Sequence, residues 1–397
     1  MPQPAFPSLA HFAASIAASI AACLAASMLV ATAAHAAPPT YRVEVLGPNL
    51  SGFDMSASGT VVGRQLNAQQ VGRAFVARRG EAPVLLPTPP EWQSSDAYAI
   101  SANGIIVGAV STGSIASIGS RAAAWHPTKA GYQFTLLTPY PGDTHSAATA
   151  VNSHGDIVGG SGGLGLGSYP RAVRFTSGPA QLLPQISTPA DINESRVVLA
   201  WNQLLDLNDM SVTTIPLPPG NWQGFVGTDL ADNGNFCGYI LGFSGCSTFP
   251  LRHRPGVGWE FVGGCATTTA ANSINEHGDA TAYVASTAAW VAFVDAGNIN
   301  PASLIAPGDG AWTILGVGSI TNSRAMLASG RPLGDPVTKL LRLVPIRTED
   351  IDGDGAVGSS DLGILLSAWG EMGGPGDLNG DGMVDSADLG QLLAAWG

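Results

Sequence analysis

Residues 100–108 read ISANGIIVG, and this phrase recurs along the chain. Each copy starts at an apolar residue, passes through turn-forming residues to a fifth position that is usually Gly, and ends in an apolar strand that closes on a small residue. The copies are MSASGTVVG (55–63), ISANGIIVG (100–108), VNSHGDIVG (151–159), INESRVVLA (192–200), LADNGNFCG (230–238), INEHGDATA (274–282) and ITNSRAMLA (320–328). Self-similarity at a period of about 45 residues indicates a repeat architecture.

A second, aromatic-rich strand follows most copies, as in RAFVARRG (73–80) and RAAAWHPTKAG (121–131), and a third apolar piece comes after it. Short strands at even spacing, separated by turn residues, are typical of four-stranded propeller blades. Seven copies therefore predict an all-β fold, a seven-bladed β-propeller over residues 40–345. A parallel β-solenoid is the alternative, but its repeats are shorter.

Such a ring must close, because otherwise its first and last sheets would expose unpaired strand edges. Residues 40–46 (TYRVEVL) form a lone alternating strand before the first copy. The last unit ends at residues 338–344 (TKLLRLV), one strand short. We predict that the N-terminal strand completes the last blade.

The chain begins with a long run of small apolar residues, 9–34, which ends in Ala34-His35-Ala36. This pattern is typical of a secretory signal peptide, residues 1–36. A membrane anchor is the alternative, because the run is long enough to span a bilayer. The small residues at its end favour cleavage. We expect a secreted or cell-surface protein, with no membrane span in the mature chain.

Three cysteines remain after cleavage: Cys237, Cys246 and Cys265. In an oxidising compartment one pair can close, most simply Cys237 with Cys246.

The formal net charge is −12, and only 12% of the residues are charged. Nucleic-acid binding requires clusters of Lys and Arg that displace counterions from phosphates. The composition therefore speaks against a nucleic-acid partner.

Much of the acidity lies in two C-terminal copies of one segment, residues 350–370 (DIDGDGAVGSSDLGILLSAWG) and 377–397 (DLNGDGMVDSADLGQLLAAWG). Each copy matches the twelve-residue calcium loop, with oxygen ligands at positions 1, 3, 5 and 12, Gly at 6 and a backbone carbonyl at 7. The predicted ligands are Asp350, Asp352, Asp354, Ala356 (by its carbonyl) and Asp361 in the first loop, and Asp377, Asn379, Asp381, Met383 (by its carbonyl), Asp385 and Asp388 in the second. Carboxylates this close would repel each other without a cation, so we expect two Ca²⁺ ions.

After each loop, apolar residues at i, i+3, i+4 and i+7 predict helices over residues 360–369 and 387–396. No helix precedes either loop, because Pro345 and the Gly/Pro-rich stretch 372–376 forbid it. We therefore expect two half EF-hands that pack on each other in an all-α module, residues 350–397, after a linker over residues 346–349.

This arrangement resembles a type I dockerin, in its two loops, in Asp at position 12 and in the Asp-Leu that opens each helix. The resemblance implies attachment to a cohesin-like protein or a cell-surface component. The family's recognition pairs follow loop position 9, and here they are Ser359, Ser360 and Ser386, Ala387. The Lys or Arg usual further along each helix is replaced by Leu366-Ser367 and Leu393-Ala394. A calcium-stabilised cap with no partner is the alternative.

The repeats also resemble extracellular repeats that read Ile-Asn-x-x-Gly-x-x-Val-Gly and then His-Ala-Phe-x-Trp. This chain has Arg at the His position, in Arg73, Arg121 and Arg171. That family is generally predicted to be propeller-like, and it has no single established activity.

One set of carboxylates in the repeats suggests a site. The residue before each copy is Asp54, Ala99, Ala150, Asp191, Asp229, Ser273 or Ser319. Repeat equivalence puts the three Asp at one level of the ring, where they would converge if that level faces the axial channel. They could then bind a cation, or act as acid and base on a glycoside. Alternatively each Asp caps its own turn, which we favour. His154 and His277 occupy equivalent turn positions, and we expect no catalytic role for them.

The sequence thus predicts an exported, non-catalytic propeller that is displayed through a calcium-dependent dockerin-like module and binds carbohydrate or takes part in surface assembly. The alternative is a propeller glycoside hydrolase or lyase in polysaccharide breakdown. That alternative rests on the proteins that usually carry dockerins, and not on any residue of this chain.

Overall fold

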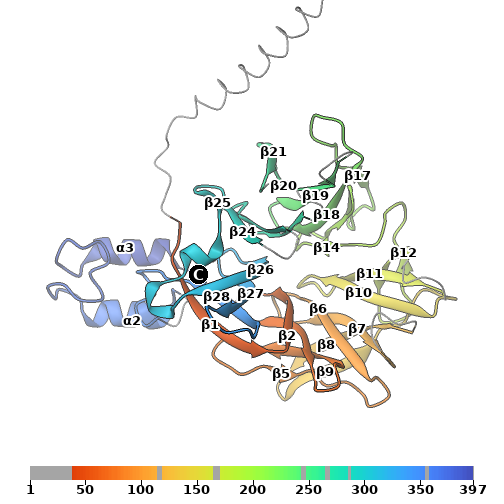
Figure 1. Ribbon diagram of the computed structural model, residues 1–397, viewed down its shortest axis with the longest axis horizontal. Helices are drawn as coiled ribbons and strands as arrows, with labels where there is room; N and C mark the ends of the chain where they lie inside the picture. Colours follow the sequence, from red (N-terminus) through yellow and green to blue (C-terminus); the bar gives the residue numbers. More distant parts are fainter. Residues whose placement is uncertain are drawn as a thin grey trace, which may run out of the picture. The chain divides into compact units, whose positions relative to one another are not determined.

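The computed structural model describes residues 38–113, 119–163, 170–242, 247–263, 269–284, 288–353 and 357–396. Seven antiparallel sheets of four strands each stand around an axis (Figure 1). The predicted seven-bladed propeller is therefore confirmed. The predicted signal peptide lies outside the described residues. Among those described, no helix is long and apolar enough to cross a membrane.

Six blades are built from consecutive strands, with the first strand of each blade innermost. Blades 1 to 3 are β2 (Leu50–Met55), β3 (Val61–Leu66), β4 (Gly72–Ala77) and β5 (Val84–Leu85); β6 (Ser94–Ile100), β7 (Ile106–Ser111), β8 (Arg121–Thr128) and β9 (Gly131–Leu136); β10 (His145–Val151), β11 (Ile157–Gly162), β12 (Arg171–Phe175) and β13 (Gln181–Leu182). Blades 4 to 6 are β14 (Asp191–Ile192), β15 (Val197–Ala200), β16 (Gln203–Asp206) and β17 (Val212–Thr214); β18 (Gly224–Leu230), β19 (Phe236–Leu241), β20 (Thr248–Arg254) and β21 (Gly258–Phe261); β22 (Thr269–Ile274), β23 (Ala280–Val284), β24 (Ala288–Phe293) and β25 (Gly297–Ile299).

Blade 7 closes the ring with strands from both ends of the propeller. It is formed by β26 (Trp312–Ile320), β27 (Met326–Pro332), β28 (Lys339–Pro345) and β1 (Tyr41–Pro48). β1 pairs antiparallel with β28, with Tyr41 opposite Pro345. Two short 3-10 helices, η1 (Pro301–Leu304) and η2 (Pro307–Asp309), precede β26. The N-terminal strand thus completes the last blade, as predicted.

The repeated phrase is the turn that joins the first and second strands of each blade. Its fifth residue has a positive φ in all seven copies: Gly59 (78°), Gly104 (84°), Gly155 (79°), Arg196 (67°), Gly234 (85°), Gly278 (88°) and Arg324 (66°). Glycine adopts this left-handed conformation at no steric cost, which explains why five copies carry it.

Asn at the second position of the phrase joins neighbouring blades. The Oδ1 of Asn152 accepts the N–H of Asp156 at 3.0 Å and closes its own turn. Its Nδ2 donates to the carbonyl of Asn193 in the next blade at 3.1 Å. Asn275 repeats the bond to the carbonyl of Thr321 at 3.0 Å. Three of the seven copies have Asn at this position, and their bonds join blades 3 and 4, 4 and 5, and 6 and 7.

The hydrophobic core lies between neighbouring blades. Where blade 1 faces blade 2, Val62 and Val76 pack with Ile106 and Trp125, all of them buried. The same arrangement recurs around the ring, so each sheet is covered on both faces by its neighbours.

The C-terminal tail contains α2 (Ser359–Ser367) and α3 (Ser386–Ala394). Within the described part of the tail, the centre of the core is formed by Val357, Leu365, Val384 and Leu392, which are fully buried, and partly buried apolar residues pack against them. Both helices end earlier than predicted. The N–H of Trp369 bonds to the carbonyl of Leu366, three residues back, and Gly370 turns into the left-handed region at φ 80°. Trp369 and Trp396 consequently lie beyond the helices, each 45% exposed.

Candidate functional site

In the first tail loop, three predicted ligands lie together. Oxygens of Asp350, Asp352 and Asp361 lie within 4.8 Å of one another. Asp361 is fully buried, and its carboxylate accepts the N–H of Asp352 at 3.1 Å and that of Gly358 at 2.7 Å. This carboxylate therefore ties the start of the loop to the start of α2. The predicted ligands Asp354 and Ala356 lie outside the described residues.

Asp388 has the equivalent position in the second loop. It is fully buried, and its Oδ1 accepts the N–H of Leu378 at 2.7 Å and of Asn379 at 3.1 Å. Its Oδ2 accepts the N–H of Asp385 at 2.8 Å. These bonds, first that from Asp385, lower the pKa of Asp388 below its usual value. The carboxylate is therefore ionised near neutral pH, as a calcium ligand must be.

The other acidic residues of the second loop also accept backbone N–H groups of the loop itself. Asp377 accepts from Gly380 at 2.9 Å and from Gly382 at 3.0 Å, and Asp381 accepts from Met383 at 3.0 Å. No Lys or Arg of the described residues forms an ion pair with Asp377, Asp381 or Asp388. The loop thus gathers uncompensated hard oxygens, the ligands that Ca²⁺ prefers.

Asp385 has a structural role beside its predicted one. It is the N-cap of α3, and its Oδ1 accepts the N–H of Ala387 at 2.7 Å. The first loop has Gly358 there, which offers no side-chain cap. This bond accounts for the Asp without a metal, and its role as a ligand stays a prediction.

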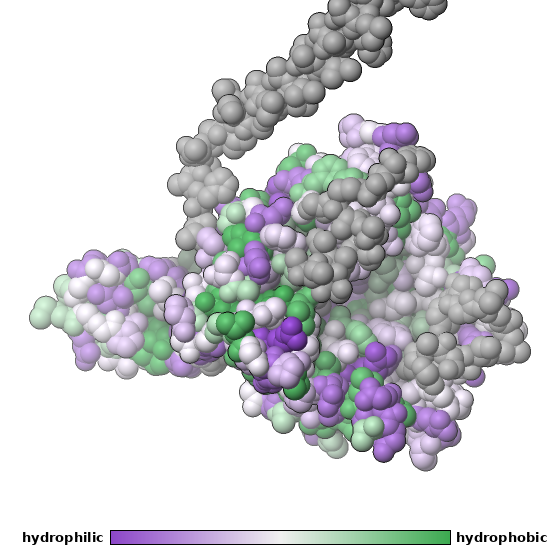
Figure 2. Space-filling model, in the orientation of Figure 1, coloured by the Kyte–Doolittle hydropathy of each residue, from purple (hydrophilic) through white to green (hydrophobic). Residues whose placement is uncertain are grey.

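The predicted partner-binding residues Ser359, Ser360, Ser386 and Ala387 are all exposed, in the first turns of α2 and α3. The predicted apolar stripe is only partly buried. Leu366 and Leu393, one residue beyond the buried leucines, are 50% and 53% exposed. Apolar and hydrophilic residues share the visible surface of the tail (Figure 2). Both helices therefore present matching polar and apolar groups to solvent.

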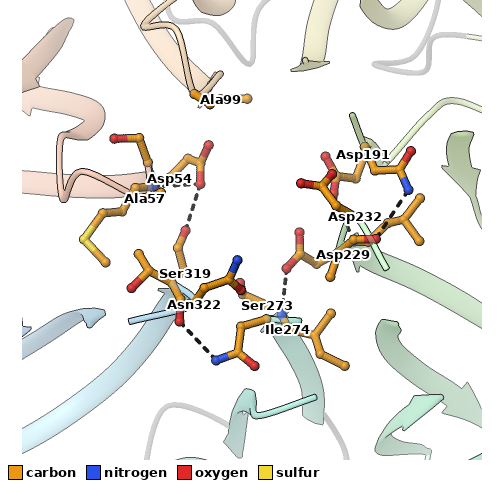
Figure 3. A pocket seen from close by; sticks show the side chains of 18 of the residues that line it. Asp54, Ala57, Ala99, Asp191, Asp229, Asp232, Ser273, Ile274, Ser319 and Asn322 are labelled. Carbon is orange, nitrogen blue, oxygen red and sulfur yellow. Dashed lines mark hydrogen bonds between the residues drawn. The ribbon is translucent and has the colours of Figure 1, made fainter. Parts of the chain in front are cut away.

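Asp54, Asp191 and Asp229 line one cavity of about 220 Å³ in the axial channel, together with Ser273 and Ser319. In Figure 3, Asp191 and Asp229 lie near each other, and Asp54 lies across the channel from them. Their strands have a register irregularity just before this position in blades 1 and 5. Such bulges re-aim side chains, here into the channel.

Each of these carboxylates connects two blades. Asp54 accepts the N–H of Ile100 at 2.9 Å, Asp191 that of Leu230 at 3.0 Å, and Asp229 that of Ile274 at 2.7 Å. The serines continue the pattern, since Ser273 accepts from Ile320 at 3.2 Å and Ser319 donates to Asp54 at 3.0 Å.

The interpretation that each Asp caps only its own turn is therefore incomplete. Asp54 and Asp191 do accept the N–H of the residue that follows them, at 2.7 and 2.8 Å, but the second oxygen of each reaches the next blade. A single Asp can serve both purposes because it has two acceptor oxygens.

The channel environment favours the neutral form of Asp54 and Asp191. Burial raises the pKa of Asp54, and burial followed by the negative charge of Asp229 raises the pKa of Asp191 well above its usual value. Both oxygens of Asp191 are engaged by backbone N–H groups. The geometry thus supports a structural role more than acid–base catalysis.

Two buried carboxylates that pair with arginines of the repeated phrase were not predicted from the sequence. Asp156 is 3% exposed and pairs with Arg174 and with Arg196, whose Nε lies 2.8 Å away. Asp279 is fully buried and pairs with Arg324 at 2.8 Å. The sequence did contain a signal for these ion pairs, because their partners Arg196 and Arg324 are the two residues that replace Gly at the fifth position of the phrase.

The histidines and cysteines have simple environments. His154 and His277 are exposed turn residues. Cys237 is a free thiol, fully buried against Val262 and Ala271, so the predicted disulfide with Cys246 is not formed in this structure. Cys246 and Cys265 lie outside the described residues.

No protein-family model and no curated protein matches the chain. Solved structures match its propeller. YCF48 bound to D1 peptide is 10% identical, with 79% of this chain and 97% of that chain covered and a TM-score of 0.43. The propeller domain of the Trilobed protease from Pyrococcus furiosus is 10% identical, with coverages of 75% and 94% and a TM-score of 0.42. Trypanosoma rangeli sialidase is 9% identical, with coverages of 82% and 57% and a TM-score of 0.32. These likenesses concern the fold alone.

Proposed function

We propose that this protein is exported and that its tail is a calcium-dependent attachment module similar to a type I dockerin. The module joins the propeller, which acts as a binding or display module, to a cohesin-like protein or another cell-surface component. The observation that supports this most directly is the pair of loop–helix units, whose position-12 carboxylates, Asp361 and Asp388, are both buried and bonded in the same way.

Calcium is the reasonable source of stability for this tail. Among the described residues of the tail, the core has four fully buried apolar side chains, one valine and one leucine from each unit, with partly buried apolar residues packed against them. A core this small does not offset the conformational entropy lost on folding, and modules of this size usually depend on a metal or on disulfides. Each Ca²⁺ would neutralise one set of clustered carboxylates and so favour the folded loops.

The exposed ends of the helices are the proposed contact surface. Ser359, Ser360, Ser386 and Ala387 offer small groups against which a partner can pack closely. Leu366 and Leu393 add apolar area further along the same helices. Burial of exposed leucines in a complex removes apolar area from water, which would drive association.

Calcium binding is tested by calorimetric titration of the metal-free mature chain. We expect two bound ions, and we expect Asp352→Ala and Asp381→Ala to remove one each. Glu371→Ala changes an exposed acid outside the predicted ligand set and serves as the control. An absence of Ca²⁺ uptake by the wild-type chain would refute the proposal.

Attachment is tested with immobilised type I cohesin modules, in excess Ca²⁺ and in excess chelator. We expect capture only with Ca²⁺, and its loss in a Leu366→Asp, Leu393→Asp double variant that still binds two ions. If the chain binds calcium but no cohesin captures it, the proposed attachment is wrong, and the tail is a metal-stabilised cap.

A further inference from the structure

An ion pair interrupts the repeat pattern between blades 1 and 2. Arg64 follows the first copy of the phrase directly, and the equivalent residues of the other copies are Ala109, Gly160, Trp201, Tyr239, Tyr283 and Ser329. Asp96 lies four residues before the second copy, and its equivalents are Ser51, Ala147, Thr188, Val226, Ala270 and Gly316. All of these equivalents are uncharged. The propeller repeat as such therefore requires neither charge.

The hydrogen bonding of this pair is incomplete. Asp96 is 3% exposed, and its Oδ2 lies 3.4 Å from Nη1 of Arg64. The Asp96 side chain also has a hydrogen bond with Tyr98, but its Oδ1 and the Nε of Arg64 are buried atoms without a well-formed hydrogen bond. A buried polar atom left without a partner costs free energy, and such atoms often mark a place for a water, an ion or a ligand.

A comparable pair in blade 3 is complete. Asp143 also has a buried carboxylate beside a partly exposed Arg. Its Oδ1 accepts from Arg171 at 2.6 Å, and its Oδ2 accepts from Ser161 at 2.8 Å. The fold can thus satisfy both oxygens of a buried Asp of this kind, whereas Oδ1 of Asp96, like Oδ1 of Asp295, has no well-formed hydrogen bond.

Arg64 and Asp96 line a cavity of about 180 Å³. That is about six times the share of liquid volume of one water molecule, room for one small ring. Gly72 makes space for the arginine, since a Cβ there would lie 2.2 Å from its Cδ. The cavity is also lined by two exposed amide side chains, Gln70 and Gln93, and by two apolar side chains, Leu66 and Val71.

The chemistry of the cavity matches a hydroxyl-rich ligand. The guanidinium and the amides donate hydrogen bonds, Asp96 accepts them, and the apolar residues can contact C–H groups. One acid and one base leave no excess charge to attract a metal cation or a simple anion. Burial also raises the pKa of Asp96, so a neutral donor–acceptor partner suits it better than a cation.

We propose that this cavity binds one sugar residue, through neighbouring hydroxyls that donate to Asp96 and accept from Arg64. The proposal rests on the role of the propeller as a binding module. It is independent of how the tail is attached.

The experiment is a binding titration of the full mature chain with methyl glycosides of neutral hexoses and of uronic acids, followed by ligand-observed NMR. We expect one member to bind with an affinity on the order of millimolar, because a single sugar offers few contact atoms. Tighter binding of either the neutral hexosides or the uronic acid glycosides identifies the class of sugar. Failure of every member to bind overturns the proposal.

Variants locate the site. We expect Asp96→Asn to weaken binding about tenfold, by loss of one charged acceptor. Gln93→Ala, an exposed change that leaves the fold intact, should weaken it a few-fold. Asp143→Asn is the matched control and should leave affinity unchanged. If Asp96→Asn and Gln93→Ala bound the sugar as tightly as the wild type, the assignment would be wrong. It would also be wrong if Asp143→Asn lost as much affinity as Asp96→Asn. Since these tests need no calcium, their failure is distinct from failure of the attachment.

Discussion

Replacing Leu392 by Ala tests whether folding of the tail and calcium binding are one process. Leu392 is fully buried and is one of four fully buried apolar side chains among the described residues of the tail, against which partly buried apolar residues pack. Its loss leaves a cavity that neighbours can fill only partly. Leu-to-Ala changes in cores cost about 2–5 kcal/mol, and for a core this open we take about 3 kcal/mol.

This cost appears in the calcium affinity only if the tail is unfolded without metal. Folding and binding then share one free energy, and a loss of about 3 kcal/mol is divided between two ions. Each factor of ten corresponds to about 1.4 kcal/mol, so each dissociation constant should rise about tenfold. The matched control is Leu393→Ala, one residue further along the helix and 53% exposed, where we expect less than about a two-fold change.

The assay is calorimetric titration of Ca²⁺ into the metal-free full chain at fixed salt concentration. Thermal unfolding of the propeller, recorded on the same samples, should be unchanged. If Leu392→Ala bound calcium as tightly as the wild type, the loops would be preformed, and the coupling argued here would be wrong. An equal effect of Leu393→Ala would show that burial is not the cause.

Three further predictions concern the propeller. Arg324→Gly restores the repeat glycine and relieves a left-handed φ of 66°, but it leaves the buried Asp279 without its ion-pair partner, so urea unfolding should show a net loss of about 1–3 kcal/mol in the unfolding free energy; a gain would contradict the role of this pair. Asp191→Asn should flatten the pH dependence of stability. Because the folded-state pKa of Asp191 is raised, the unfolded chain ionises first as the pH rises, and the unfolding free energy of the wild type falls between the ordinary pKa and the raised one. Equal slopes in the two proteins would refute this, while a constant offset of about 1 kcal/mol is expected from the lost acceptor. Deleting residues 37–48 removes β1, exposes the edge of β28 and should cause association in light scattering together with a lower melting temperature; a monomer of unchanged melting temperature would show that closure is dispensable.

The blade number and the closing strand could be predicted from the sequence because one turn recurs with its chemistry intact. Positive φ at the fifth position favours Gly, which five of the seven copies have, and the bonds of Asn152 and Asn275 to the next blade favour Asn, which three copies have. The direction of Asp54 could not be predicted, because it depends on a bulge one residue earlier that shifts the strand register. The bond from Asp54 to Ile100 joins residues 46 positions apart, and no local pattern reports it.

In the tail, periodicity predicted the helices but not which leucine is buried. Leu365 and Leu366 both fit the apolar stripe, and only the packing of one unit on the other distinguishes them. The pairing of Arg64 with Asp96 could not be predicted from the sequence for a different reason. They belong to different blades, and the cavity between them exists only after the two sheets have packed together.

The placement of β28 has a mechanical consequence. The tail departs from Pro345, the last residue of β28, and this strand is hydrogen-bonded to β1 on one side and to β27 on the other. Tension applied through the tail acts along the strand, while antiparallel hydrogen bonds lie across it. The hydrogen bonds of β28 to β1 and to β27 are then loaded in shear and resist together, instead of breaking one after another. A propeller held through its C-terminal tail under flow would therefore resist extraction of β28 better than a propeller held through the outermost strand of a blade.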